Sequence, residues 1–224
     1  MKGDIINVEV HHKKAASAII AHLIQAIKNK GRIYTITVGG ESGSGKSEIS
    51  LALSNELNKF GIKSVILGQD DYFFLPPASN SEKRHTDPDW LGPHIEVNLD
   101  LLEKNIIDAI QGKSIIEKPL VDYNANTIET QTLNLMDVKV VIAEGTYTSL
   151  LRNIDSKIFI TRNWLTTLED RKKRNRGKEA SDPFVEKILA TEHKIIAGHR
   201  YLADFIINDQ FEVTIVEPER MNEY

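Results

Sequence analysis

Residues 40–47 combine the residue types and the spacing of a phosphate-binding loop. They read Gly-Glu-Ser-Gly-Ser-Gly-Lys-Ser and meet the pattern G-x-x-x-x-G-K-[ST]. Glycines let the backbone curl so that successive N–H groups point at phosphate oxygens, while the lysine reaches the terminal phosphates and the last hydroxyl ligates Mg²⁺. We therefore predict a site for ATP or GTP with Mg²⁺. The predicted nucleotide-binding residues are Gly40, Glu41, Ser42, Gly43, Ser44, Gly45, Lys46 and Ser47.

Two acidic residues follow apolar runs, which is where residues at strand ends are found. Asp70 comes shortly after a Val-Ile-Leu run, and Glu144 ends a Val-Val-Ile-Ala run. Beside phosphates, Asp70 is a candidate catalytic base for an attacking hydroxyl, or a group that holds a water of the Mg²⁺ shell. Glu144 is a candidate metal residue together with Ser47. The alternative for each acid is a turn residue, and Asp71 is the better candidate for a turn or helix cap.

Six basic residues are crowded into residues 171–178 around Gly177. One interpretation is a solvated helix face. A second is a lid that closes over phosphates, neutralises charge during transfer and excludes water. A third is a nucleic-acid patch. The formal net charge of −4 and the pI near 6.0 disfavour that third interpretation and also a membrane-surface role.

Short apolar strands alternate with amphipathic helices, which predicts a parallel sheet with helices on both faces. Ligands in such sheets bind beyond the carboxyl ends of the strands, so the loop, Asp70 and Glu144 are expected to meet at one edge. A loop-rich stretch is expected from Leu75 to Pro93. The expected strands are 33–38, 65–67, 138–143, 157–160 and 211–216; the expected helices are 13–30, 47–60, 98–110 and one that begins near 166.

Length and composition set outer bounds. With 224 residues and 41% hydrophobic residues, we expect one domain over 1–224, with a helical extension at 1–31, a substrate-side insert at about 75–97 and a lid at about 166–185. There is no cysteine, which excludes disulfides and thiolate sites. No signal peptide or bilayer-spanning run stands out, so the expected location is cytoplasmic. The first helix has two candidate roles, packing on the sheet or a contact in a homo-oligomer.

Further motifs carry a family resemblance over residues 33–208. Besides the loop they are Gln-Asp-Asp-Tyr-Phe at 69–73, Val-Val-Ile-Ala-Glu-Gly at 140–145 and Tyr-Leu-Ala-Asp-Phe-Ile-Ile at 201–207. In this the chain resembles the uridine kinase / phosphoribulokinase / pantothenate kinase group of P-loop kinases. The resemblance implies ATP-dependent transfer to a hydroxyl, with Asp70 as base. It also implies an arginine lid. Arg171 and Arg174 of this lid are expected to be catalytic, as is Lys46 of the loop, and Arg176 is expected to bind the nucleotide.

The acceptor side departs from the uridine kinase pattern. Asp89, displaced by about two positions, is the counterpart of a ribose-binding carboxylate, and the histidine expected soon after Tyr123 is missing. The first expected acceptor is a uridine-like nucleoside. The alternatives are pantothenate, a sugar phosphate or nicotinamide riboside as acceptor, or a non-catalytic nucleotide-binding regulator. The predicted substrate-binding residues are Tyr72, Phe73, Asp89, His94, Asp122 and Tyr123, with Arg84 as a further candidate in the insert.

Overall fold

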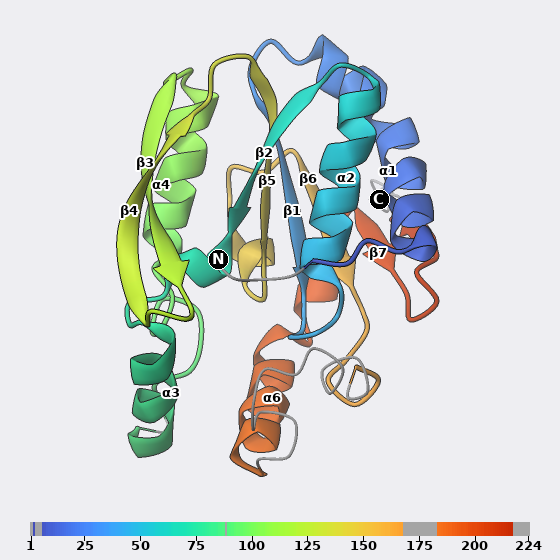
Figure 1. The fold of residues 1–224 in the computed structure, drawn as a ribbon. Helices are drawn as coiled ribbons and strands as arrows, with labels where there is room; N and C mark the ends of the chain where they lie inside the picture. Colours follow the sequence, from blue (N-terminus) through green and yellow to red (C-terminus); the bar gives the residue numbers. More distant parts are fainter. Residues whose placement is uncertain (1, 3–5, 88, 168–182, 217–224) are drawn as a thin grey trace, which may run out of the picture.

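A six-stranded sheet forms the centre of the computed structural model, which describes residues 2, 6–87, 89–167 and 183–216 (Figure 1). The strand order is β2-β5-β1-β6-β7-β8. The first five of these strands are parallel to their neighbours, and only β8 pairs antiparallel, with β7. The bounds are β1 Tyr34–Gly40, β2 Lys63–Gly68, β5 Val138–Gly145, β6 Ser156–Ile160, β7 Phe205–Ile207 and β8 Val213–Ile215.

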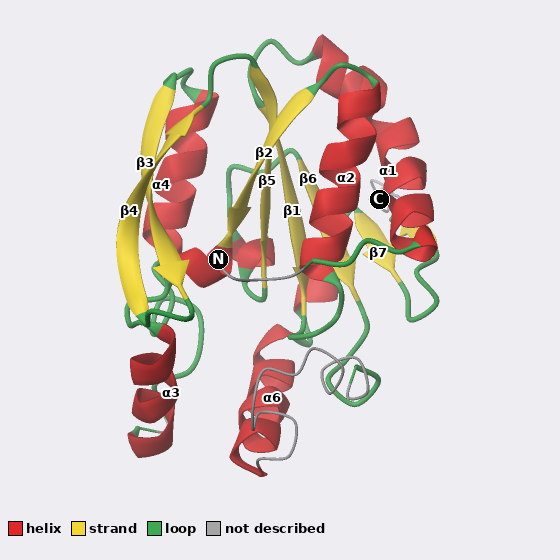
Figure 2. Cartoon of the chain, in the orientation of Figure 1, coloured by secondary structure: helices red, strands yellow, loops and turns green. Residues whose placement is uncertain are grey.

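The apolar runs of the strands are continuous because both faces of the sheet are covered. In β5, Val140 and Ile142 pack into one hydrophobic cluster, whereas Val141 and Ala143 pack into another. Side chains alternate between the faces of a strand, so these two clusters lie on opposite sides of the sheet. The expected parallel sheet with helices on both faces is confirmed (Figure 2).

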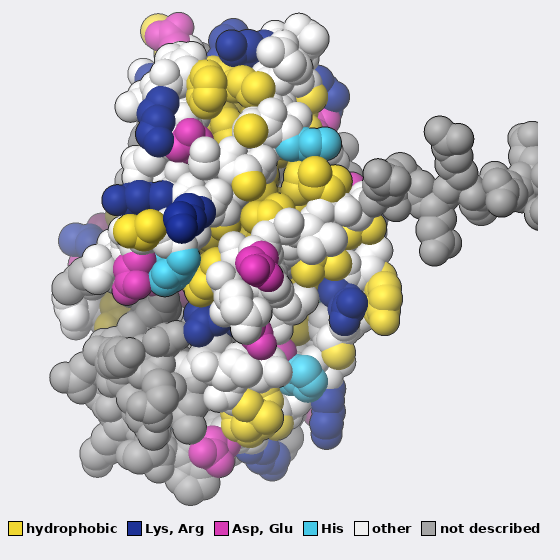
Figure 3. Space-filling view, turned by 90° about the vertical axis from the view of Figure 1, so that its right-hand side faces the viewer, with side chains coloured by type: hydrophobic (Ala, Val, Ile, Leu, Met, Phe, Trp, Pro, Cys, Tyr) yellow, Lys and Arg dark blue, Asp and Glu magenta, His cyan; other side chains and the backbone are white. Residues whose placement is uncertain are grey.

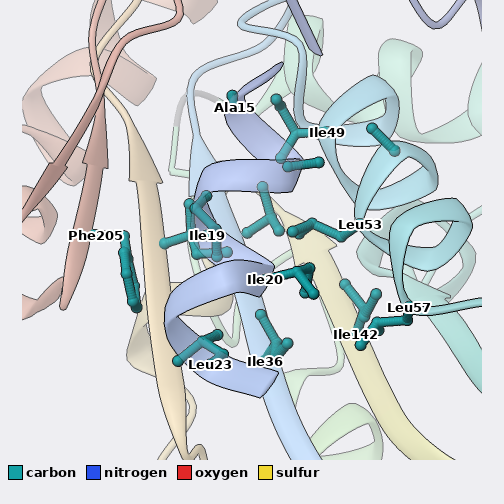
Figure 4. Packing of buried hydrophobic residues seen from close by; sticks show 14 of the residues in the cluster. Ala15, Ile19, Ile20, Leu23, Ile36, Ile49, Leu53, Leu57, Ile142 and Phe205 are labelled. Carbon is teal, nitrogen blue, oxygen red and sulfur yellow. The ribbon is translucent and has the colours of Figure 1, made fainter. Parts of the chain in front are cut away.

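Helices α1 (Val10–Asn29) and α2 (Lys46–Lys59) cover one face of the sheet. Ile19 and Ile20 of α1 lie beside Leu53 of α2 and Ile36 of β1, and all four side chains are completely buried (Figure 4). Burying a side chain of this size stabilises the fold by about 1.5–3 kcal/mol. The helical extension therefore packs on the sheet, the first of its two candidate roles.

The opposite face is covered by α4 (Leu99–Ile110) and by the end of α6 (Pro183–Ile196). Leu102 and Ile106 of α4 are buried there. The Asn98 side chain accepts a hydrogen bond from the backbone N–H of Leu101 at 3.0 Å and is the N-cap of this helix.

Three regions differ from the expectation. Residues Phe205–Ile207, which were not among the expected strands, form β7. The stretch expected to be a loop contains helix α3 (Pro77–Thr86), which begins at a proline in its first turn. The segment after α4 forms an antiparallel hairpin, β3 (Ile115–Asp122) and β4 (Thr127–Asn134), separate from the main sheet. Its alternation of polar and apolar residues has the period of a half-exposed strand. Short helices are η1 Gln69–Tyr72, η2 Thr148–Leu150 and η4 His199–Leu202.

Charges of both signs are interspersed with hydrophobic side chains on the face that carries α1 (Figure 3), as expected for a formal net charge of −4. No helix in the described part of the chain is long and apolar enough to cross a membrane.

Candidate active site

The loop at residues 40–47 connects the end of β1 to the start of α2, as the sequence predicts. Gly43 and Gly45 have φ angles of 78° and 103°, a region that residues with a Cβ rarely adopt. Gly45 is the N-cap of α2, so the loop and the positive end of the helix dipole face the same side. This geometry suits the binding of phosphate groups.

Lys46 and Glu41 interact within the loop. The Lys46 Nζ donates to the Glu41 carbonyl oxygen at 2.9 Å. The Glu41 carboxylate accepts from the Trp164 backbone N–H at 2.6 Å and pairs with His193 of α6 at 2.6 Å. Glu41 therefore anchors the loop to residues that precede and follow the predicted lid. Its carboxylate is engaged with the protein, and only its backbone is available for phosphate contacts.

Ser47 lies against Glu144, as the predicted metal site requires. The Ser47 hydroxyl donates to Glu144 Oε1 at 3.2 Å. Glu144 reaches this position because β5 lies between β1 and β2 in the sheet. Burial and the neighbouring negative charge of Asp70 raise the pKa of Glu144 to about 7, while Lys46 and the Ser47 hydroxyl oppose this change.

This donor set fits Mg²⁺. A hard divalent cation favours oxygen ligands and would offset the repulsion between the neighbouring carboxylates of Asp70 and Glu144. Among the described residues, no group of three or more His, Asp or Glu side chains could hold a metal. Mg²⁺ in P-loop sites is bound by one or two protein oxygens plus substrate phosphates, so the set formed by Ser47 and Glu144 matches that chemistry.

Asp70 is held in place by the buried residues on either side of it. It lies in η1, directly after β2, and is partly exposed. The Gln69 side chain accepts from the Tyr147 backbone N–H at 2.7 Å. The Asp71 carboxylate pairs with Lys118 at 2.5 Å and accepts from the Val121 backbone N–H at 3.0 Å. Asp71 is thus a buried anchor and not a turn residue, and Asp70 is left beside Glu144 and Lys46.

Tyr72 is a correction to the predicted substrate-binding set. Its side chain is 1% exposed, and its hydroxyl donates to Asn105 Oδ1 of α4 at 2.9 Å. It belongs to the hydrophobic core and has no surface for stacking a base. Phe73 is partly buried, and the Arg84 guanidinium lies 5.7 Å from its ring centroid.

The remaining predicted acceptor residues lie at separate places: Asp89, His94 and Tyr123 are exposed, whereas Asp122 is buried. Asp89 is exposed, and its backbone N–H donates to the side chain of Asp87. His94 is 56% exposed and lies 3.4 Å from Asp100. The Asp122 carboxylate pairs with Lys2 at 2.8 Å and accepts from the Ala125 backbone N–H, so it closes the β3–β4 turn. Tyr123, also in that turn, is 39% exposed.

The predicted lid residues Arg171, Arg174 and Arg176 lie outside the described residues. The long helix expected from about residue 166 falls mostly in this segment. The described helix that follows the segment is α6.

A buried polar cluster beside the site was not predicted. Glu96 is completely buried and accepts from Arg84 Nε at 2.7 Å and Nη2 at 2.6 Å. Glu96 also contacts Asn80 Nδ2 at 3.2 Å and the Tyr147 hydroxyl at 3.4 Å. Trp90 donates from its indole nitrogen to Asn80 at 2.8 Å. The only sequence signal was a lone acid between Ile95 and Val97.

The fold and the site together define a P-loop nucleotide-binding protein. The loop after β1, the serine at the start of α2 and the acid at the end of the neighbouring strand are the three parts that such proteins share. The profile of the Phosphoribulokinase / Uridine kinase family matches residues 35–180. The chain belongs to this family of P-loop kinases, which use a hydroxyl group as the phosphoryl acceptor.

Curated relatives include two kinds of kinase. The chain is 25% identical over 207 residues to the bifunctional alpha-galactosidase/sucrose kinase AgaSK of Mediterraneibacter gnavus, matching 81% of this chain but only 22% of that protein. It is 29% identical over 187 residues to the uridine kinase of Lactiplantibacillus plantarum, with 79% and 87% covered. A solved structure of D-glycerate 3-kinase from Cryptococcus neoformans has the same fold, with a TM-score of 0.61 at 15% identity, covering 93% of this chain and 98% of that one.

Proposed function

We propose that this protein transfers the γ-phosphoryl group of ATP to a hydroxyl of a small molecule. One observation carries the proposal: Lys46, Ser47 and Glu144 lie beside Asp70 at one edge of the sheet. The first three serve the phosphates and their counter-ion. Asp70 is a carboxylate that these functions do not use, and the hydrogen bonds of Gln69 and Asp71 on either side of it support a role as the acceptor base.

Each group of the chain has a distinct task in this reaction. The loop N–H groups and Lys46 bind the phosphates and stabilise the charge that develops on them. Mg²⁺, held through Ser47 and Glu144, would supply further neutralisation of phosphate charge. Asp70 orients the acceptor hydroxyl and accepts its proton as the oxygen attacks phosphorus.

The lid arginines belong to the proposal as well. Arg171 and Arg174 would contact the transferring phosphoryl group, and Arg176 the nucleotide, as the family resemblance implies. The described residues give the lid a fixed base, because Trp164 before it and His193 after it both contact Glu41 of the phosphate loop.

Two acceptor types have support. A nucleoside is the first candidate because several curated relatives are uridine kinases. A sugar is the second because the sucrose kinase AgaSK aligns with most of this chain. Both present several neighbouring hydroxyls.

The test is phosphoryl transfer from ATP to an acceptor panel by wild type and by Asp70→Asn. We expect kcat to fall by roughly 10²–10⁴-fold in the variant, while the Kd for ATP changes less than about twofold. Asp100→Asn is the matched control, because the Asp100 side chain is 88% exposed. Wild-type turnover by Asp70→Asn would refute the base. Tight ATP binding without transfer to any acceptor would favour a nucleotide-binding regulator instead.

A further inference from the structure

Glu192 of α6 is a buried acid that the proposed mechanism does not use. It is 7% exposed. Its Oε2 makes no hydrogen bond to any residue that the structure describes. Removing a carboxylate from water without giving it hydrogen-bond donors is unfavourable, so such a group calls for a functional explanation.

Arg84 is the cation whose charge acts most strongly on Glu192, but its guanidinium is hydrogen-bonded to another acid. Its Nε and Nη2 both donate to Glu96, at 2.7 and 2.6 Å. Glu96 is completely buried, so this ion pair is fixed and leaves no net charge. Glu192 is therefore a second acid beside an arginine whose charge Glu96 already balances.

Glu192 lies close to the phosphate loop, because His193, the next residue of α6, pairs with Glu41 of that loop at 2.6 Å. Burial raises its pKa to about 7, and the charges of Arg84, Glu96, Lys46 and Asp70 all act on it. The influence of Lys46 and Asp70 agrees with this position close to the phosphate loop.

The elements that hold this cluster lie together beyond the carboxyl edge of the sheet. Helices α3 and α6 both project there (Figure 1). The His85 ring of α3 stacks on the Phe184 ring of α6, with centroids 3.5 Å apart. The cluster of Arg84, Glu96 and Glu192 therefore lies on the same side of the sheet as Asp70, which directly follows β2.

We propose that Glu192 is an acceptor-binding residue that receives a hydrogen bond from an acceptor hydroxyl, and that it restricts the acceptor to uncharged polyhydroxy compounds. A hydroxyl donor satisfies the free carboxylate oxygen, whereas a phosphate or carboxylate would bring a further negative charge close to Glu192 and Asp70. A buried site discriminates strongly against a group that leaves its polar atoms unpaired or adds a like charge. Nucleosides and free sugars fit this site; sugar phosphates and pantothenate do not. The inference rests on the proposed kinase activity.

The experiment compares each uncharged acceptor with its anionic counterpart. Uridine is assayed against uridine 5′-phosphate, and D-fructose against fructose 6-phosphate, by ADP release from the full chain. We expect wild type to use one of the uncharged compounds with a kcat/KM at least 100-fold above that of its phosphorylated form.

Variants of Glu192 then test the residue itself. Glu192→Gln is expected to raise the KM for the uncharged acceptor at least tenfold, with the KM for ATP changed less than twofold. Glu192→Asp keeps the charge and should recover part of that loss. Glu186→Gln, exposed on the same helix, is the control and should match wild type. The Kd for ATP checks that every variant is folded.

The outcomes separate this inference from the proposed function. Preference for an anionic acceptor, or an unchanged acceptor KM in Glu192→Gln, would overturn the role of Glu192 and leave the kinase intact. Absence of transfer to every acceptor, with ATP bound, would overturn both. The wild-type panel remains decisive even if Glu192→Gln does not fold.

Discussion

Replacing Glu192 by glutamine should stabilise the protein in alkaline solution. Burial raises the pKa of the Glu192 carboxyl from an ordinary 4.5 to about 7. The folded state therefore binds more protons than the unfolded state between these values. As far as Glu192 is concerned, the free energy of unfolding is undiminished below about pH 4.5. It falls as the pH rises and reaches its lower limit above about pH 7. Glutamine carries no charge and removes this dependence.

The size of the effect follows from the same two values. One pKa unit corresponds to about 1.4 kcal/mol, so the interval from 4.5 to about 7 gives an upper limit of about 3–4 kcal/mol. We expect the free energy of unfolding of Glu192→Gln, relative to wild type, to rise by about 1–3 kcal/mol between pH 5 and pH 8.

Urea unfolding of wild type, Glu192→Gln and the control Glu186→Gln at pH 5, 6, 7 and 8 measures this difference without ligands. Other titrating groups cancel, because they are shared by all three proteins. Two results would refute this reasoning. One is a difference in unfolding free energy between Glu192→Gln and wild type that does not vary with pH. The other is a Glu192→Gln variant that is less stable than wild type at pH 8, where the buried Glu192 carboxylate of the wild type is ionised. A variant that is more stable but binds acceptor less well is the trade-off expected at a functional site.

Three further substitutions test the framework of the site. Lys118→Met removes the cation that pairs with the buried Asp71 carboxylate, and should lower the free energy of unfolding by about 3–5 kcal/mol in urea; a loss below about 1 kcal/mol would mean that the pair is unimportant. At Gly145 a β-carbon would lie 2.8 Å from Gln69 Cδ, so Gly145→Ala should displace the residue before Asp70 and lower kcat about 10–100-fold; an unaltered kcat would contradict this. Asn98→Ala removes the N-cap of α4 and should cost about 1 kcal/mol in thermal unfolding, whereas an unchanged Tm would mean that the cap adds nothing.

Features encoded by contiguous residues could be predicted from the sequence. The phosphate loop is one, because eight neighbouring residues supply its glycines, its lysine and its serine. The sheet is another, because apolar runs of strand length are required wherever both faces are covered. Together, the phosphate loop and the parallel sheet predicted that Glu144 and Asp70 lie at the same edge of the sheet. The structure has this arrangement, because β5 pairs in parallel with both β1 and β2.

Tertiary structure alone decided which polar residues are buried and what they face. Tyr72 lies in a motif shared with kinases, yet packing against α4 makes it a core residue. Glu41 and His193 are 152 positions apart in the chain and still form an anchor of the loop. Glu192 and Glu96 resemble surface acids in the sequence, because nothing in the local pattern distinguishes them. Burial of a carboxylate depends on what other segments pack around it, so the acceptor side of this site emerges only from the fold.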